Sequence, residues 1–409
     1  MSIAQEAVEL HKSHSGKLEV KSKVPLRDGI DLSLAYTPGV AEPCRLIKDD
    51  PSKVYDYTLK ANSVAVISDG SRVLGLGNIG PEAGLPVMEG KAVLFKEFGG
   101  VDAFPICLNV GNEEEFIQVA RALAPSFGGF NLEDIATPKC YDIEDRLKEE
   151  LDIPVFHDDQ HGTAAVALAG VIGGLRLVGK RLDNVNVVVN GAGAAGTAIS
   201  RLLLHMGAGH LSVCDVDGLL NPKNARLNRV QMELASKTNP SGRTATLEEV
   251  VGGADVLIGV SAPSAFTVDL MKRMAKDSIV FAMANPVPEA DRESALFAGV
   301  RVFGTGKSGE PNQVNNVLVF PGIFRGALDV RARKINEEMK VAAVKALVSL
   351  ISDDELTEDH VIPDPFDRRV APAVAKAVAS TAVETGVARI YLNEADINAL
   401  YAKRLSELS

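Results

Sequence analysis

Two adjacent acids, Asp158 and Asp159, stand between an apolar approach and a helix-like run. Residues 153–156 have the apolar pattern of a strand, and residues 164–170 are small or apolar, which indicates a buried helix. The acidic pair is therefore predicted to lie where a strand ends and a helix begins, next to free backbone N–H groups. Taken alone, an acid at such a position is typical of a helix N-cap.

A second acidic pair, Glu133 and Asp134, lies upstream beside the Gly/Phe-rich residues 126–130. Hard divalent cations such as Mg²⁺ and Mn²⁺ prefer oxygen ligands, carboxylates among them. Two acidic doublets beside small or apolar residues therefore favour an oxygen-ligand site for such a cation. The alternative for this second pair is a solvated acidic turn.

The clearest pattern is a glycine-rich loop at residues 191–196. Strand-like residues 185–190 come before it, and helix-like residues 197–205 follow without a helix breaker. Asp215 ends the next predicted strand about 20 residues beyond the glycines, which completes a dinucleotide-binding fingerprint. The loop residues expected to bind the cofactor are Gly191, Ala192, Gly193, Ala194, Ala195 and Gly196.

Each glycine of this loop has a physical reason to be there. Gly191 allows the turn, Gly193 lets the backbone approach the pyrophosphate, and Gly196 lets the helix pack closely on the strand. The N-terminus of the helix then faces the phosphate charge. The loop therefore predicts a dinucleotide site, and a Rossmann scaffold without a ligand is the alternative.

The acid at Asp215 favours NAD over NADP. Its carboxylate would accept hydrogen bonds from a ribose 2′-hydroxyl and would repel a 2′-phosphate. Asp217 adds negative charge where a phosphate reader would carry Arg or Lys, although Lys223 and Arg226 downstream leave NADP open.

A second glycine pattern, at residues 75–80, also matches G-x-G-x-x-G. A dinucleotide loop must open a helix, whereas here Pro81 follows at once and Gly84 and Pro86 are close behind. We therefore expect a tight loop near a substrate rather than a cofactor loop.

The chain of 409 residues is long enough for two domains with separate cores. We predict an α/β substrate and metal domain at 1–155, and a Rossmann-type, doubly wound parallel-sheet domain with C-terminal helices at 156–409. The strands expected are 63–68 and 101–108 in the first domain, and 185–190, 211–215, 254–260, 278–284 and 300–305 in the second. The helices expected include 86–98, 113–123, a long amphipathic 324–351 and an alanine-rich 369–384.

The composition is that of a soluble globular protein, with 46% hydrophobic and 24% charged residues. A net charge of −11 without a compensating basic block argues against nucleic-acid or anionic-membrane partners. The four cysteines form no CxxC or CxxH pair and are expected to be small buried residues of a reduced compartment. No signal peptide is evident, and the longest apolar run, 164–174, is too short to span a bilayer, so we expect a cytoplasmic protein.

Several motifs, in order, resemble those of malic enzymes. They are residues 36–41, 72–77, the helix that carries Lys91, residues 155–163 and residues 315–322. The resemblance covers nearly the whole chain, and the length is similar to the short prokaryotic form. It implies oxidative decarboxylation of L-malate to pyruvate and CO₂, with NAD or NADP and with Mg²⁺ or Mn²⁺. It also implies a homodimer or a higher homo-oligomer.

The resemblance assigns the metal and the general base. It places the metal ligands on Glu133, Asp134 and Asp159, which would leave coordination positions for the C2 hydroxyl and a C1 carboxylate oxygen of malate. Lys91 matches the general base, and Asp158 matches its partner. A lysine suits this role only with a lowered pKa, which a nearby cation and partial burial would produce.

The remaining roles implied by the resemblance concern the substrate. Tyr36 matches the general acid that protonates the enolate at C3, and Arg72 resembles the guanidinium clamp for a carboxylate. Asn285 and Asn316 resemble substrate-orienting amides, and Asn315 could exchange roles with its neighbour. Asp217 is a departure, because many members of the family carry a basic residue there.

Three rival functions deserve a comparison with this assignment. A malolactic-type lyase, with the same fold and cofactors, would release lactate, and the sequence separates it poorly from a malic enzyme. A non-catalytic NAD-binding sensor would be expected to lack Lys91, Tyr36 or an acidic ligand, and all of these are present. Another two-domain dehydrogenase, such as an amino-acid dehydrogenase, would not need the three carboxylates of the metal set.

Overall fold

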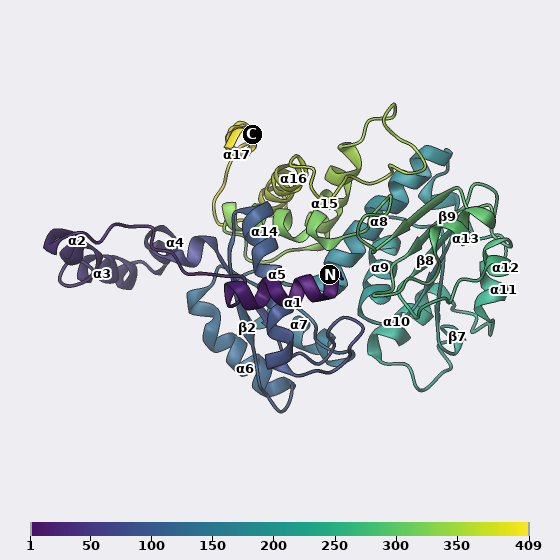
Figure 1. Cartoon of the computed structure of the whole chain (residues 1–409), viewed down its shortest axis with the longest axis horizontal. Helices are drawn as coiled ribbons and strands as arrows, with labels where there is room; N and C mark the ends of the chain where they lie inside the picture. Colours follow the sequence, from purple (N-terminus) through teal and green to yellow (C-terminus); the bar gives the residue numbers. More distant parts are fainter. Residues whose placement is uncertain (1, 408–409) are drawn as a thin grey trace.

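The computed structural model describes residues 2–407 and contains two parallel sheets (Figure 1). The first sheet has the strand order β2-β1-β3-β4, with all neighbours parallel. Its strands are β1 (Ser63–Ser68), β2 (Asp102–Cys107), β3 (Gly129–Leu132) and β4 (Val155–His157). Its helices are α5 (Pro81–Gly99), α6 (Glu113–Leu123) and α7 (Lys139–Glu150). The carboxyl ends of β3 and β4 lie side by side, so the two acidic doublets that follow them meet at one edge.

The second sheet has six strands in the order β10-β9-β8-β5-β6-β7, and only β7 runs antiparallel to its neighbour. Its strands are β5 (Asn186–Asn190), β6 (His210–Asp215), β7 (Gly218–Leu219), β8 (Val256–Gly259), β9 (Ile279–Ala282) and β10 (Val302–Thr305). Its helices are α9 (Ala194–His205), α10 (Arg229–Thr238), α11 (Leu247–Val251), α12 (Val268–Met271) and α13 (Arg292–Phe297). The Rossmann-type sheet expected from the sequence is confirmed, while the short hairpin strand β7 was not predicted.

The helix α8 (Asp158–Val178) connects the two sheets and forms part of the main core. Most of its residues are buried, and it packs against α9 and α15 (Figure 1). By length and composition it could cross a membrane, which the shorter run seen in the sequence did not suggest, but 67% of its apolar window is buried inside the protein. A buried core helix explains that apolar character.

The glycine loop at 75–80 differs from our expectation. Pro81 is the first residue of α5, so the loop does open a helix, and the prediction that it would not is wrong. Proline is favourable at this position because its missing N–H has no intrahelical partner there. The loop nonetheless does not follow the strand directly, because β1 already ends at Ser68. A bridge between Val73 and Gly77 closes a tight turn that includes the start of the loop.

The C-terminal part is helical but more broken than predicted. The helices are α14 (Phe320–Asp329), α15 (Glu337–Ser349), α16 (Val370–Glu384) and α17 (Glu394–Glu407). The single helix expected at 324–351 is therefore wrong. The chain turns at Arg331, which has a φ of 48°, and Asn336 caps the next helix through its side chain. The predicted helix at 369–384 is confirmed within one residue.

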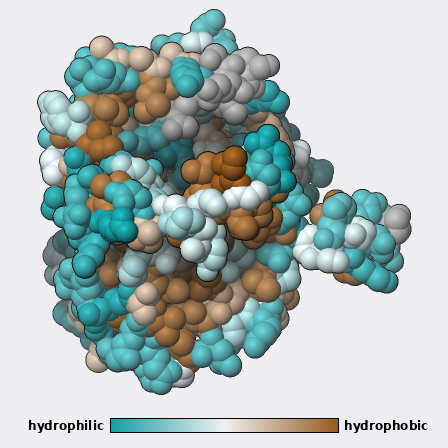
Figure 2. Space-filling model, turned by 90° about the vertical axis from the view of Figure 1, so that its left-hand side faces the viewer, coloured by the Kyte–Doolittle hydropathy of each residue, from teal (hydrophilic) through white to brown (hydrophobic). Residues whose placement is uncertain are grey.

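An arm at the N-terminal side projects from the body (Figure 1). It carries α2 (Gly29–Ala35), α3 (Ala41–Asp49) and α4 (Val54–Tyr57), none of which contains a buried residue. The helix α1 (Ile3–His14), likewise without a buried residue, also projects: it lies in front of the body in Figure 1 and stands out at the right in Figure 2. In Figure 2, which is seen from the side of the arm, the arm points toward the viewer in front of the body. Cys44 lies on the arm and is exposed and Cys107 is half-buried, so the expectation of four buried cysteines holds only for Cys140 and Cys214.

Candidate active site

Lys91 of α5 lies between two carboxylates from the neighbouring strand ends. Its Nζ is 2.7 Å from Asp158 Oδ2 and 2.9 Å from Glu133 Oε1, and its side chain is only 11% exposed. The ammonium also lies 4.4 Å from the centroid of the Phe320 ring. Burial acts to lower the pKa of Lys91, but the charges of Asp158 and Glu133 outweigh it and raise the pKa. The side chains alone therefore do not produce the lowered pKa that a general base requires.

The Asp158 carboxylate is held by groups from two helical segments. Its Oδ2 accepts from Lys91 and from Asn316 Nδ2 at 2.9 Å, and Asn316 Nδ2 also lies 3.0 Å from Thr163 Oγ1. Asp158 is the first residue of α8 and His157 is its N-cap, so the N-cap interpretation is wrong. A Cβ at residue 162 would lie 1.8 Å from Asp158 Oδ1, which explains the glycine of this motif.

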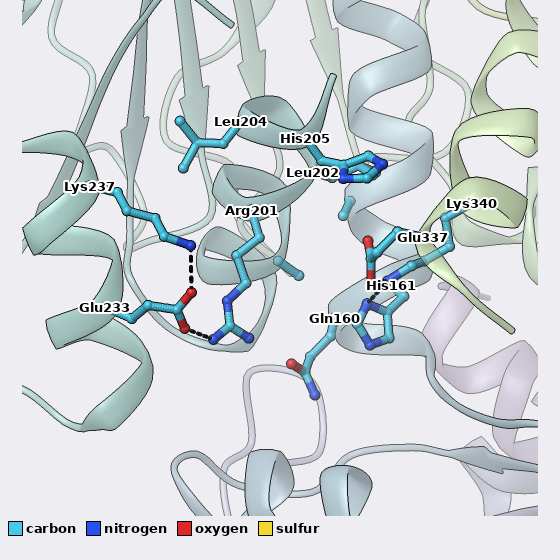
Figure 3. Close-up of a pocket in the computed structure, with 12 residues that line it drawn as sticks. Gln160, His161, Arg201, Leu202, Leu204, His205, Glu233, Lys237, Glu337 and Lys340 are labelled. Carbon is cyan, nitrogen blue, oxygen red and sulfur yellow. Dashed lines mark hydrogen bonds and ion pairs between the residues drawn. The ribbon is translucent and has the colours of Figure 1, made fainter. Parts of the chain in front are cut away.

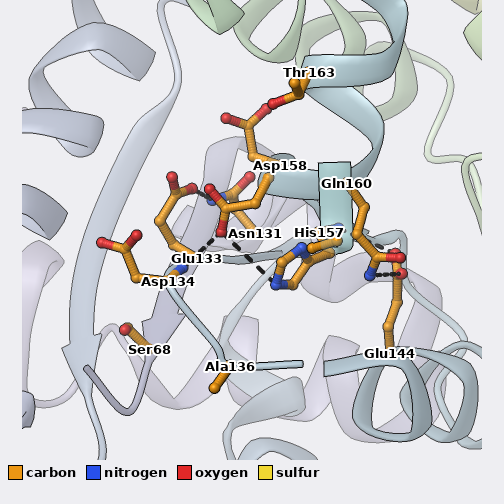
Figure 4. Close-up of polar contacts among 12 residues, drawn as sticks. Ser68, Asn131, Glu133, Asp134, Ala136, Glu144, His157, Asp158, Gln160 and Thr163 are labelled. Carbon is orange, nitrogen blue, oxygen red and sulfur yellow. Dashed lines mark hydrogen bonds and ion pairs between the residues drawn. The ribbon is translucent and has the colours of Figure 1, made fainter. Parts of the chain in front are cut away.

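Two of the acids assigned to the metal, Glu133 and Asp134, lie side by side near Asp158 (Figure 4). Glu133 and Asp134 follow β3, and Asp159 Oδ2 accepts from the Asp134 N–H at 2.8 Å. Asn131 Nδ2 donates to Glu133 Oε2 at 2.8 Å. Asp134 adopts a φ of 54°, a conformation that aspartate tolerates better than most residues.

The electrostatics of this cluster suit a cation. Burial, followed by the charge of Asp159, raises the pKa of Asp134 to about 7, and burial raises the pKa of Glu133 well above its ordinary value. Asp134 Oδ2 and Asp158 Oδ1 are buried acceptors without a hydrogen-bond partner, as a ligand oxygen would be. The donor set, all carboxylate oxygens, fits Mg²⁺ or Mn²⁺. Within residues 2–407, however, no three such side chains already stand at ligating distances.

The candidate substrate residues Arg72 and Asn285 lie on two loops that touch. The Arg72 N–H donates to the Asp134 carbonyl at 3.0 Å, and its side chain is exposed. Asn285 is also exposed, just beyond β9. A Cβ on Gly75 would lie 2.7 Å from Pro286 Cδ, so the glycine loop packs directly on the segment of Asn285.

The neighbours Asn315 and Asn316 have different contacts. Asn315 Oδ1 accepts from the Val317 N–H at 3.0 Å and caps the short 3-10 helix at Asn316–Leu318. Asn316 is the one that reaches Asp158. Thr163, which completes this contact, was not singled out from the sequence, although it belongs to the same motif.

Tyr36 is not brought to this site within one copy of the chain. It ends α2 on the projecting arm, and the residue is 68% exposed. In Figure 1 the arm helices lie well apart from α5 and α8.

The predicted dinucleotide loop has the geometry that its glycines suggested. Gly191 has a φ of 109°, and a Cβ there would lie 2.4 Å from the Val260 carbonyl oxygen. A Cβ on Gly196 would lie 1.7 Å from the Gly191 oxygen, whereas the space around Gly193 is open. The helix α9 begins at Ala194 without a side-chain cap, so its first N–H groups are free to bind phosphate.

Gln231 fixes the acid expected to read the ribose. Its Nε2 lies 3.1 Å from both Asp215 Oδ2 and the Ala192 carbonyl oxygen, so one amide joins the acid to the loop. Asp217 pairs with Arg226 at 3.4 Å. Gln231 was not predicted from the sequence, although Asn228 and Gln231 form a capping box whose spacing is visible there.

Comparison with known proteins identifies the family. Residues 15–148 match the model for the malic enzyme N-terminal domain, and residues 160–383 match the model for the malic enzyme NAD-binding domain. A bifunctional malic/malolactic enzyme from Bacillus subtilis is 59% identical, over 97% of both chains. An NAD-dependent malic enzyme from Geobacillus stearothermophilus is 56% identical, over 91% of this chain and 78% of that one.

Solved structures agree. The crystal structure of malic enzyme from Pyrococcus horikoshii is 49% identical and has a TM-score of 0.94, over 99% of this chain and 96% of that one. That of the NAD-dependent malic enzyme from Thermotoga maritima is 48% identical with a TM-score of 0.88, over 91% and 98%. With both domain models matched in order and the site motifs in place, this chain belongs to the malic enzyme family.

Proposed function

We propose that this chain oxidatively decarboxylates L-malate to pyruvate and CO₂ with reduction of NAD(P), at the site of Lys91 and the acids around it. The observation that carries the proposal is the buried Lys91 ammonium, held 2.7 Å from Asp158 and 2.9 Å from Glu133 beside the candidate metal ligands. A Mg²⁺ or Mn²⁺ ion on Glu133, Asp134 and Asp159 would supply Lewis-acid polarisation of the C2 oxygen.

Proton transfer and substrate binding are proposed to be carried out by the following residues. As the neutral amine, Lys91 would accept the proton of the C2 hydroxyl and become the ammonium, and Asp158, which Asn316 holds in place, would orient the lysine and balance that charge. A cation on the three carboxylates would also oppose the charges that now raise the pKa of Lys91. Arg72 and Asn285, which lie on two loops in contact, would hold and orient the substrate carboxylates.

The general acid is proposed to come from a second copy. Tyr36 stands on an arm whose apolar side chains have no cover in this chain, among them Leu26, Ile30 and Leu34, each at least 66% exposed. An exposed apolar patch of this kind marks an interface. A homodimer in which the arm packs on the partner would cover these side chains and bring Tyr36 to the partner's site.

NAD is the proposed preferred cofactor, because Gln231 holds the Asp215 carboxylate at the ribose position. Replacing Asp215 with serine should raise kcat/KM for NADP by about 10-fold or more, since a charge that repels the 2′-phosphate is removed. The value for NAD should fall. Initial rates with both cofactors test this, with Glu384→Gln, an exposed charge loss on α16, as the control. An unchanged cofactor ratio would show that Asp215 does not read the ribose.

The reaction itself is tested by absorbance at 340 nm with L-malate and Mn²⁺, with NAD and NADP in parallel. We expect reduced cofactor and pyruvate to appear together, and only with the metal.

A malolactic activity is the second candidate, because a relative with 59% identity is named a bifunctional malic/malolactic enzyme. Lactate without reduced cofactor would show that activity, and no turnover would favour an NAD-binding sensor. The charge of −11 supports the proposal that nucleic acids and anionic membranes are not partners.

A further inference from the structure

A buried carboxylate that the proposed reaction does not use lies beneath the turn from β4 to α8. Glu144 of α7 is only 3% exposed and points toward His157 and Gln160 (Figure 4). Its Oε1 accepts from the His157 backbone N–H at 3.1 Å, and its Oε2 accepts from Gln160 Nε2 at 2.9 Å. His161 Nε2 lies 2.9 Å and Lys148 Nζ 2.7 Å from Oε1.

These partners keep Glu144 ionised. Burial acts to raise its pKa, but the charge of Lys148 and the hydrogen bond from His161 outweigh burial and hold the pKa well below its ordinary value. A buried charge is tolerated only when it is paired and hydrogen-bonded, and four donors satisfy Glu144. The carboxylate is therefore a strong, fixed acceptor for the groups around it.

The contacts continue to a third helix. Lys340 Nζ of α15 lies 3.1 Å from His161 Nδ1, and an ammonium can only donate, so Nδ1 accepts and Nε2–H donates to Glu144. Lys340 also pairs with Glu337. The side chains of His161, Glu337 and Lys340 line a cavity of about 490 Å³ (Figure 3). The first turn of α8 is thus hydrogen-bonded both to Glu144 of α7 and to Lys340 of α15.

We propose that Glu144 is a positioning residue for the metal ligand Asp159 and for its neighbour Asp158. The two acids have no direct contact with Glu144 among the hydrogen bonds of the described residues, but its donors flank them in the chain: His157 comes before, and Gln160 and His161 come after. Holding both sides of the pair fixes the backbone from which the two carboxylates project. The inference rests on the proposed metal set.

The test is Mn²⁺ affinity, measured by electron paramagnetic resonance of the free ion without substrate. In Glu144→Gln an NH₂ group replaces one of the two acceptor oxygens and faces hydrogen-bond donors. The turn from β4 to α8 therefore loses part of its support. We expect the Mn²⁺ dissociation constant to rise by about 10- to 100-fold, as is usual when a group supporting a metal ligand is lost. NADH binding, followed by fluorescence, should be unchanged, because the glycine loop lies on another strand. A variant that was merely destabilised would weaken both.

The matched control is Glu149→Gln, the same change at an exposed position of the same helix. Wild-type Mn²⁺ affinity in a folded Glu144→Gln protein would overturn the inference. If circular dichroism shows that this variant does not fold, Gln160→Met takes its place: it removes one donor to Glu144, and wild-type affinity in it would be equally decisive.

Asp159→Asn in the same titration separates the two proposals. Unchanged Mn²⁺ binding in Asp159→Asn would refute the ligand set itself. Lost binding in Asp159→Asn together with wild-type binding in Glu144→Gln would refute only the positioning role.

Discussion

Replacing Lys91 with alanine should lower kcat for malate oxidation by about 10²- to 10⁴-fold, the usual contribution of a positioned general base. The reason is geometric, because Lys91 Nζ is held 2.7 Å from Asp158 and 2.9 Å from Glu133 beside the proposed substrate position. The measurement is the rate of NADH formation at 340 nm under saturating malate and Mn²⁺. NADH binding should be retained, because the dinucleotide loop is on the other sheet.

Two further variants separate chemistry from folding. Lys91→Ala leaves two buried carboxylates without their cation, which is expected to cost about 3–5 kcal/mol of stability. Lys91→Arg keeps a positive charge but cannot give up its proton, so it should fold better and still be inactive. Lys96→Ala, on the same helix with a side chain 57% exposed, should be close to wild type. An Lys91→Arg enzyme with wild-type kcat would exclude Lys91 as the base.

The parts of this structure that sequence could predict are those with local signals. The glycine loop at 191–196 and the strand before it are specified by close approaches within a few residues, such as the Gly196 position against the Gly191 oxygen. The doublet at 158–159 was predictable for a similar reason, since a strand-like run precedes it, whereas the strand β3 before Glu133 was not predicted. The meeting of the two acidic doublets required the pairing of β3 with β4, which the sequence implied only through the resemblance.

What could not be predicted depends on contacts between distant segments. Glu144 looks like one of many acids on a charged helix, and only the packing of α7 against the start of α8 reveals its role. The break near Arg331 lacks a proline or glycine, although Asn336 before two glutamates was an overlooked cap signal. The position of Tyr36 on a projecting arm is a property of tertiary structure, and its family role gave no hint of it. The predicted boundary between 155 and 156 stays a prediction.

Substituting Tyr36 with phenylalanine should impair pyruvate formation while sparing hydride transfer, because only enolate protonation needs the phenol. A wild-type rate of pyruvate tautomerisation by Tyr36→Phe would refute the general-acid role. The same variant can test whether the active site is shared between two copies of the chain. Tyr36 is 68% exposed on the arm, whereas Lys91 is buried in the body, so the two residues do not meet within one copy.

Hybrid dimers, made from one Tyr36→Phe copy and one Lys91→Ala copy with different affinity tags, decide whether the arm is exchanged. If each site takes Tyr36 from the partner, one site of the hybrid carries both substitutions and the other carries neither. The hybrid should then recover about half of the wild-type activity per dimer, as twofold symmetry requires. If each copy used its own Tyr36, every site would carry one substitution, and pyruvate formation by the hybrid would not exceed the mean of the two parents. Failure to isolate any hybrid after co-expression, with a monomer by light scattering, would refute the dimer and with it the placement of the acid.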